Sequence, residues 1–484
     1  MKPITGLFLG AGASYEVGMP LVWELTTEFK NWLTPEKLRN LSVGWRAQGT
    51  GPSDALIEDF ISILMQPDMH YEALLGYLEV QFMRFNNAMR QEYHGFYSWM
   101  IEMIYHLLYY RQVNNRAFLD KQLPRFDGIR ALTEASTPLW VFSLNHDVMI
   151  ETIAARLAIP LYTGFSDKII QLPLRNSIGQ KIGEIRAETL SQDQLDNNAM
   201  FYPNPLQPGI YLMKIHGALD IFAFNDGKDL LKLLPECPDT YGYVDVLRAA
   251  NENLIYPLPG APSGRAKASN EITYADETGE MQFLRRSLLS GAYKFNARSQ
   301  QVLPKSMLKH FQANLNFVTN LICIGYGLGD QHINAIIREW LAFTSERRLE
   351  IVSPSIEEVP SSLLHLSPQV TLTRSNTSDF LDQRSGTVRS TREQLEKRIS
   401  DSLRQRGQSR ARQDMNAFAM KNQETLIALL IKKLTELPHE NGQPNLAALG
   451  NPIEIANRWA AEVKMGEEEF LTALIEHLED TQKG

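Results

Sequence analysis

Cysteine is scarce in this chain of 484 residues, which contains only Cys237 and Cys323, far apart in the sequence. Two cysteines exclude a disulfide framework and a four-cysteine zinc site, and they fit the reducing cytoplasm. Long apolar runs are also absent, since none reaches the roughly 18 residues of a membrane-spanning helix. The short run Leu7–Leu9 is broken by glycine, so we interpret it as a strand and not as part of a signal peptide. We therefore expect a cytoplasmic protein with no membrane segment.

The sequence also has no excess of positive charge. The net charge is −8, which excludes a surface built as a whole for non-specific nucleic-acid binding. Apolar residues make up 44% and charged residues 21%, an ordinary globular balance. The length predicts two or three domains. We expect an α/β domain over 1–372 with a helical insertion at about 54–125, a basic linker over 373–414 and an α-helical C-terminal module over 415–484.

The first glycine-rich stretch lacks parts of both common phosphate-binding loops. Gly10-Ala11-Gly12-Ala13-Ser14 follows an apolar run and precedes an amphipathic stretch, Leu21 to Leu33. The dinucleotide fingerprint has a third glycine where this chain has Tyr15, and no Gly-Lys-Ser/Thr loop is present. The pattern predicts a strand, a tight turn and a helical region, whose backbone N–H groups and helix dipole suit a pyrophosphate. An ordinary tight turn is the alternative.

Four later apolar runs have the composition of buried strands, and helical segments separate them. They cover 139–144, 210–215, 321–324 and 349–352, with helices expected at 148–157, 305–315 and 333–343. This alternation predicts a doubly wound parallel sheet of Rossmann-like type. We expect loops over 160–208 and a variable region with turns between 217 and 304.

Small or reactive residues follow each strand. They are Gly10–Ser14, Asn145–Asp147, His216, Gly325–Asp330 and Ser353. Carboxyl ends of parallel strands meet at one crevice, so we expect these residues to form one site. Taken singly, His216 also fits a core or turn histidine and Asp147 a helix cap. Asp330 before His332 favours a helix cap, and His146 with His216 lacks the further ligands of a metal site.

Two regions outside the expected sheet are helical in pattern. Between Asp54 and Asn115 apolar residues recur at helical spacing, and the aromatic cluster of 93–110 fits helix packing better than a cofactor pocket. Beyond residue 414, blocks at 415–437, 452–463 and 467–480 predict helices. The basic stretch 384–412 fits a solvated linker or docking face better than a nucleic-acid site, because few aromatic residues accompany it.

As an ordered set, these motifs resemble those of the sirtuins over roughly residues 1–372. Gly10–Ser14 with Gly18 and Pro20 resembles the opening motif, and Asn145-His146-Asp147 resembles Asn-x-Asp. Lys214-Ile215-His216-Gly217 resembles the strand that bears the catalytic histidine. Gly325-Tyr326 with Asp330 resembles the bacterial sirtuin-like branch, although Gly327 stands where serine is usual. The missing zinc module and Leu21-Val22-Trp23 in place of Phe-Arg favour the branch that cleaves NAD, often in antiphage defence.

The resemblance implies a sirtuin-type fold and an NAD glycohydrolase that releases nicotinamide and ADP-ribose, with NAD as substrate and no metal. It implies catalytic roles for Asn145, His216 and Asp147. Because nicotinamide leaves as a neutral group, the chemistry needs a placed water, a base and support for an oxocarbenium-like cation. The residues expected to hold the rest of NAD are Gly10, Ala11, Gly12 and Ser14 at the pyrophosphate and Gly325, Tyr326 and Ser353 at the adenosine half.

Other functions remain open at this point. A sensor that binds NAD or ADP-ribose without turnover needs neither Asn145 nor His216, and an ADP-ribosyltransferase or deacylase would use the same pocket. Since an unregulated NAD hydrolase harms its host, we expect control through the C-terminal module. Its apolar faces suggest a homo-oligomer or docking to a partner, such as a HerA-type ATPase or another defence protein.

Overall fold

The structure is a computed structural model that describes residues 3–166, 168–197, 199–261, 263–288, 306–390, 392–394, 396–397, 401, 439–440 and 443–444. The chain divides into two compact units, Met1–Gly386 and Thr387–Gly484. The described part of the second unit includes a short antiparallel pair, β14 (His439–Glu440) with β15 (Gln443–Pro444). The three helical blocks expected between 415 and 480 lie outside the described residues.

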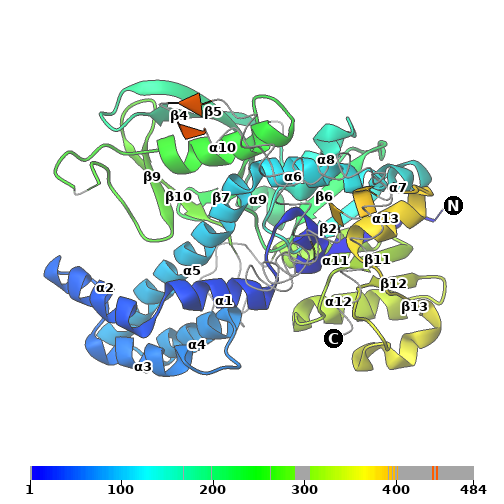
Figure 1. Cartoon of the computed structure of the whole chain (residues 1–484), viewed down its shortest axis with the longest axis horizontal. Helices are drawn as coiled ribbons and strands as arrows, with labels where there is room; N and C mark the ends of the chain where they lie inside the picture. The colour runs from blue at the N-terminus through cyan, green and yellow to red at the C-terminus, as the bar shows by residue number, and fades with distance from the viewer. Residues whose placement is uncertain are drawn as a thin grey trace. The chain divides into compact units, whose positions relative to one another are not determined.

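The first unit contains a parallel sheet of seven strands, whose labelled members lie on the right in Figure 1. Every pair of neighbouring strands in it is parallel. In spatial order the strands are β13 (Val370–Thr373), β12 (Arg348–Val352), β11 (Asn320–Ile324), β1 (Thr5–Leu9), β2 (Leu139–Ser143), β6 (Ile210–Lys214) and β3 (Leu161–Tyr162). This α/β architecture is Rossmann-like, so the expected doubly wound parallel sheet is confirmed.

Helices cover both faces of this sheet because its side chains alternate between two cores. Leu7 and Leu9 of β1 face one core and Phe8 faces the other. The first core includes residues of α7 (Ile129–Ala135), α8 (Met149–Arg156) and α13 (Thr377–Ser385). The second includes residues of α11 (Ser306–Leu315) and α12 (Gln331–Ala342). Burial on both faces explains why the inner strands are near-continuous apolar runs.

A second sheet, which the sequence analysis did not predict, has six antiparallel strands. Its order is β4 (Ile169–Arg175), β5 (Lys181–Leu190), β8 (Asp229–Leu234), β7 (Ile221–Phe224), β10 (Met281–Arg286) and β9 (Glu271–Ala275). The expectation of loops over 160–208 is therefore wrong. Polar residues alternate with apolar ones in β4 and β5, and Pro173 is tolerated because β4 is an edge strand. Between β8 and β9 lies α10 (Thr240–Asn253), and α9 (Gln192–Asp196) follows β5.

A group of helices between β1 and β2 confirms the helical periodicity. Besides α7, these are η1 (Ala11–Val17), α1 (Val22–Trp32), α2 (Pro35–Ala47), α3 (Asp54–Leu64), α4 (Tyr71–Arg84), α5 (Ala88–Asn114), α6 (Arg116–Gln122) and η2 (Leu123–Phe126). The long helix α5 runs from α1 and α4 towards α10, which it also contacts (Figure 1). Its aromatic residues Phe96 and Tyr97 are buried against the rings of Phe60 in α3 and Phe82 in α4. Tyr105 is buried too, but its hydroxyl donates to the carbonyl oxygen of Leu219, just before β7. Within the described residues, no helix combines the length and apolar character that crossing a membrane requires.

The first unit ends later than the sequence predicts. Residues 373–386, expected in a basic linker, form the end of β13 and α13, and η3 (Ser361–Gln369) precedes them. Phe380 and Leu381 of α13 are buried. The buried carboxylate of Glu16 accepts hydrogen bonds from the amide and hydroxyl of Ser378, at 2.8 and 2.6 Å. The first turn of α13 is thus bonded to the segment that follows the first glycine turn.

Candidate functional site

The candidate residues lie along the edge of the parallel sheet at which the carboxyl ends of its strands meet. Strand register places Leu9 beside Ile324 on one side and beside Ser143 on the other, and Ser143 beside Lys214. The strand order reverses between β1 and β11, so this pair of strands forms the topological switch point of the sheet. In open α/β sheets, ligands bind outside the carboxyl strand ends at such a point.

The two glycine turns at the switch point pack backbone against backbone. Gly10 N–H donates to Ile324 O at 3.0 Å, and Gly12 N–H donates to Gly325 O at 2.9 Å. A Cβ on Gly325 would lie 2.3 Å from the amide nitrogen of Ala13, and the φ of Gly325 is +62°. Only glycine allows this approach without strain. The amides of Gly10 and Gly12 donate within the protein, so this arrangement does not offer them to a pyrophosphate, contrary to the expected N–H cradle.

Asn145 joins the end of β2 to the first glycine turn. Its Nδ2 donates to the carbonyl oxygen of Gly10 and to Oγ of Ser14, both at 2.8 Å. Asn145 and Ser14 are buried. Because a carbonyl only accepts hydrogen bonds, the Gly10 contact identifies the amide nitrogen and leaves Oδ1 as the side chain's acceptor. An acceptor at this edge suits a water molecule or a ribose hydroxyl.

His216 pairs with Asp330 on the same edge, although 114 positions separate them in the sequence. Nε2 of His216 lies 3.3 Å from Oδ2 of Asp330, and the two side chains are only 5% and 9% exposed. Oδ1 of Asp330 accepts the amides of His332 and Ile333 at 3.1 and 3.3 Å, so the expected helix cap is confirmed. A carboxylate beside an imidazole orients the ring and stabilises it when it takes up a proton. The pairing gives His216 the partner of a general base.

Tyr326 connects the histidine pair to the first glycine turn. Its Cα lies 2.5 Å from the position that a Cβ of Gly10 would take. Its hydroxyl lies 2.8 Å from Oδ1 of Asn334 and 3.2 Å from the carbonyl oxygen of Asp330. Burial, together with the charge of Asp330, raises the pKa of Tyr326, so the hydroxyl stays protonated as a donor. Tyr326 thus helps to hold Asp330 at the second turn.

Asp147 and Ser353 lie on the edge but make mainly local contacts. Oδ1 of Asp147 accepts the amide of Met149, the first residue of α8, at 3.0 Å, but the N-cap residue of this helix is Val148 and not Asp147. Ser353, after β12, donates its amide to Thr373 O at 3.1 Å, and its Oγ lies 3.4 Å from that of Ser355. The structure therefore brings Asn145 together with Gly10, Ser14 and Gly325, and His216 with Asp330 and Tyr326. Asp147 and Ser353 share the edge only as residues that follow β2 and β12.

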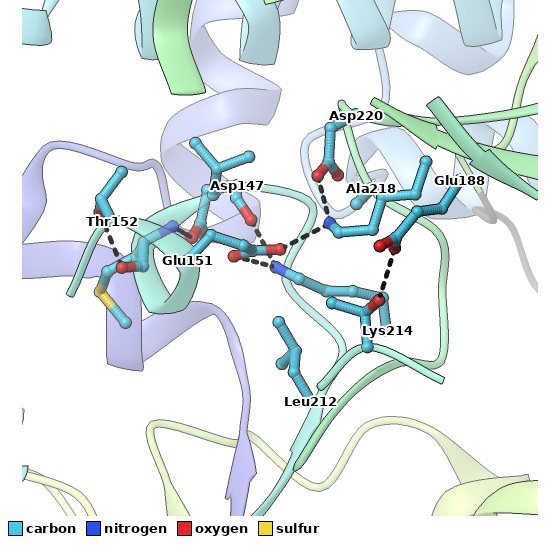
Figure 2. A network of polar contacts seen from close by, with 12 residues as sticks. Asp147, Glu151, Thr152, Glu188, Leu212, Lys214, Ala218 and Asp220 are labelled. Atoms are coloured by element: carbon cyan, nitrogen blue, oxygen red, sulfur yellow. Dashed lines mark hydrogen bonds and ion pairs between the residues drawn. The ribbon is translucent and has the colours of Figure 1, made fainter. Parts of the chain in front are cut away.

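A network of buried charged side chains lies next to the end of β6, and the sequence did not predict it (Figure 2). Glu151 of α8 lies between two ammonium groups, with Oε1 3.0 Å from Lys232 Nζ and Oε2 3.5 Å from Lys214 Nζ. Lys232 also pairs with Asp220. All four side chains are at most 3% exposed. The signal was present in Lys232, a lysine among leucines in the run Asp229–Leu234.

The charges in this network change one another's pKa values. Burial raises the pKa of Glu151, but Lys214 and Lys232 outweigh burial, so the net pKa is lowered and the carboxylate stays ionised. Burial lowers the pKa of Lys232, but Asp220 and Glu151 reverse that effect and raise it. Burial also raises the pKa of Asp220, against the attraction of Lys232. Two positive and two negative charges thus balance inside the protein.

Other ligand sites near this edge are limited. Across the residues that the structure describes, no three His, Cys, Asp or Glu side chains are grouped as ligands for a metal ion. A cavity adjoins the charge network, lined by the stems of Lys214 and Lys232 and by apolar side chains that include Phe165, Leu212 and Leu230. The candidate site therefore consists of backbone turns, one amide and a histidine–carboxylate pair.

The fold and the strand edge define a Rossmann-like α/β domain with a polar site at its switch point. In comparisons with protein-family models and with curated protein sequences, the chain matches none. A function for this chain is therefore inferred from the residues of the site.

Proposed function

We propose that this chain is an NAD glycohydrolase of sirtuin type, which cleaves NAD to nicotinamide and ADP-ribose. The observation that carries the proposal is the His216–Asp330 pair at 3.3 Å, on the same strand edge as Asn145. A protein that only binds a nucleotide has no need of a buried histidine–carboxylate pair on the same strand edge as a placed amide. The switch-point location and the resemblance of the motifs agree with this choice of substrate.

In the proposed reaction, water replaces nicotinamide at C1′ of the ribose. The bond from C1′ to the pyridine nitrogen breaks, and its electron pair leaves with neutral nicotinamide. The water oxygen bonds to C1′, and His216 takes the proton that this water loses. Asp330 stabilises the resulting imidazolium. NAD⁺ and water thus give nicotinamide, ADP-ribose and one proton.

The remaining residues bind and orient NAD in this proposal. Oδ1 of Asn145 accepts from the attacking water or a ribose hydroxyl, because Nδ2 is engaged by Gly10 and Ser14. Asp147 supports the ribose or the nicotinamide amide in addition to accepting the amide of Met149. Gly10, Ala11, Gly12 and Ser14 border the pyrophosphate, while Gly325, Tyr326 and Ser353 border the adenosine half. Gly10 and Gly12 contribute through close approach and not through their N–H groups.

The proposal extends to regulation in a bacterial cytoplasm. NAD depletion harms the cell that makes the enzyme, so we place the chain among regulated effectors of antiphage defence. Its C-terminal module would mediate homo-oligomerisation or docking to a HerA-type ATPase or another defence protein. Removing residues 387–484 would then change the oligomeric state and the rate of NAD cleavage, measured by light scattering and nicotinamide release.

The direct test measures nicotinamide release from NAD by chromatography. Wild type is compared with Asn145→Ala and His216→Ala, with and without candidate partners, and with His365→Ala as a matched control at an exposed histidine. We expect the two site variants to lose activity and the control to keep it. Robust release by His216→Ala would refute the mechanism. NAD binding without turnover, unchanged in His216→Ala, would favour the sensor.

A further inference from the structure

The carbonyl groups of the segment that carries Asn145 accept hydrogen bonds from one side chain and one backbone amide. Lys214 Nζ donates to the carbonyl oxygen of Asp147 and lies 3.4 Å from that of Asn145. Between these two, the carbonyl oxygen of His146 accepts the amide of Leu219 at 2.8 Å. Three consecutive carbonyl groups between β2 and α8 are therefore held by β6 and the connection that follows it. The segment's position depends on Lys214 at two of the three.

Lys214 reaches this segment because its ammonium group is stabilised in the interior. Its side chain is 3% exposed, and Glu151 lies 3.5 Å away to balance its charge. Figure 2 shows Lys214 between Glu151 and the backbone near Asp147. A buried ammonium group needs both a counter-charge and hydrogen-bond acceptors, and the Asn145–Asp147 carbonyls supply the acceptors.

We propose that Lys214 is a positioning residue: by holding the Asn145–Asp147 backbone, it fixes the amide of Asn145 against Gly10 and Ser14. Lys214 is the last residue of β6, and His216 lies two residues beyond it, in the turn that follows the strand. One ammonium group therefore sets the spacing between the residue that orients the water and the residue that takes its proton. The catalytic consequence rests on the proposed NAD hydrolysis, whereas the effect on the backbone does not.

Lys232 provides a matched control within the same network. It is as buried as Lys214, and it also pairs with Glu151, but its other partner is Asp220 and not the Asn145–Asp147 segment. Lys214→Met and Lys232→Met each leave one unbalanced negative charge. A general loss of charge balance would affect both variants equally. A positioning role affects Lys214→Met alone.

The first measurement does not depend on activity. Hydrogen–deuterium exchange of a peptide spanning residues 144–149 is followed by mass spectrometry in the full-length protein. We expect faster exchange there in Lys214→Met than in Lys232→Met. Equal exchange in the two variants would overturn the proposal, whether or not the protein cleaves NAD.

The second measurement separates positioning from stability. Lys214→Met is expected to lower kcat for nicotinamide release about 100-fold with little change in KM, the scale of a displacement of about 1 Å. Lys214→Met with Glu151→Gln restores charge balance, so its unfolding midpoint should recover while kcat and the exchange at 144–149 do not. Recovery of kcat together with the midpoint would overturn the proposal. If wild type releases no nicotinamide with any of the candidate partners, the proposed function fails, and the exchange data still decide the role of Lys214.

Discussion

Replacing Gly325 by alanine tests whether the two glycine turns are packed as described. The new Cβ would lie 2.3 Å from Ala13 N and 2.4 Å from Gly12 C, distances at which backbone must move. It would also place a side chain at φ +62°, which costs about 1–2 kcal/mol. Overpacking adds about 1–3 kcal/mol. Alanine's smaller entropy in the unfolded chain returns about 0.4–1 kcal/mol. We expect a net loss of about 1–5 kcal/mol in the free energy of unfolding.

The matched control lies two residues away. A Cβ on Gly327 meets nothing within 4 Å, and Gly327 is outside the set of positive-φ glycines. Gly327→Ala should therefore change the free energy of unfolding by no more than about 0.5 kcal/mol. Urea unfolding followed by tryptophan fluorescence measures both variants under the same conditions. If Gly325→Ala is as stable as Gly327→Ala, the turns are not in backbone contact and the geometry of the switch point is wrong.

Three further predictions concern stability. Burial, with Arg286 nearby, lowers the pKa of His106 from 6.5 to about 4, so the folded state stays neutral where the unfolded state is protonated. The free energy of unfolding should therefore fall, by at most about 3 kcal/mol, as the pH drops from about 6.5 to about 4. His106→Phe should remove that part of the pH dependence. The same pH dependence in the variant and in wild type would contradict this prediction. Glu16→Gln weakens the charge-assisted hydrogen bonds to Ser378 and should lower the free energy of unfolding in urea by about 1–2 kcal/mol. The control Glu346→Gln, at an exposed position, should leave it unchanged. Equal stability of these two variants would refute the buried contact. Asn145→Ala removes two hydrogen bonds and should cost about 1–3 kcal/mol, and no loss in thermal unfolding would mean that the amide is not bonded to the turn.

The parallel sheet was predictable because its strands are buried on both faces. All five residues of β2 are buried, as are those of β6, so each appears in the sequence as an apolar run. The antiparallel sheet gives no such signal. In β5 exposed Glu184 and Arg186 alternate with buried Ile185 and Ala187, and the strand is recognisable only by its partners. Alternation over a few residues resembles a polar loop when proline and asparagine lie nearby.

The site was predictable in its position more than in its contacts. Strand ends identified Asn145 and His216, because the carboxyl ends of parallel strands share one edge. The pairing of His216 with Asp330 was missed, since a carboxylate that caps a helix gives no sign that its second oxygen serves another residue. Lys214 and Lys232 were missed because buried lysines are rare, and only the folded chain reveals the acids that balance them.

The central position of β1 also determines when the site can be assembled during synthesis. Thr5 pairs with Asn320 across the sheet, and Glu16 receives Ser378. At about 5–20 residues per second, the ribosome makes β11 roughly 15–60 s after β1. Gly10 and Asn145 are thus complete long before Gly325 and Asp330 exist. A nascent chain therefore carries only part of the candidate site while residues 146–324 are made. The histidine–carboxylate pair forms only when nearly the whole first unit has left the ribosome.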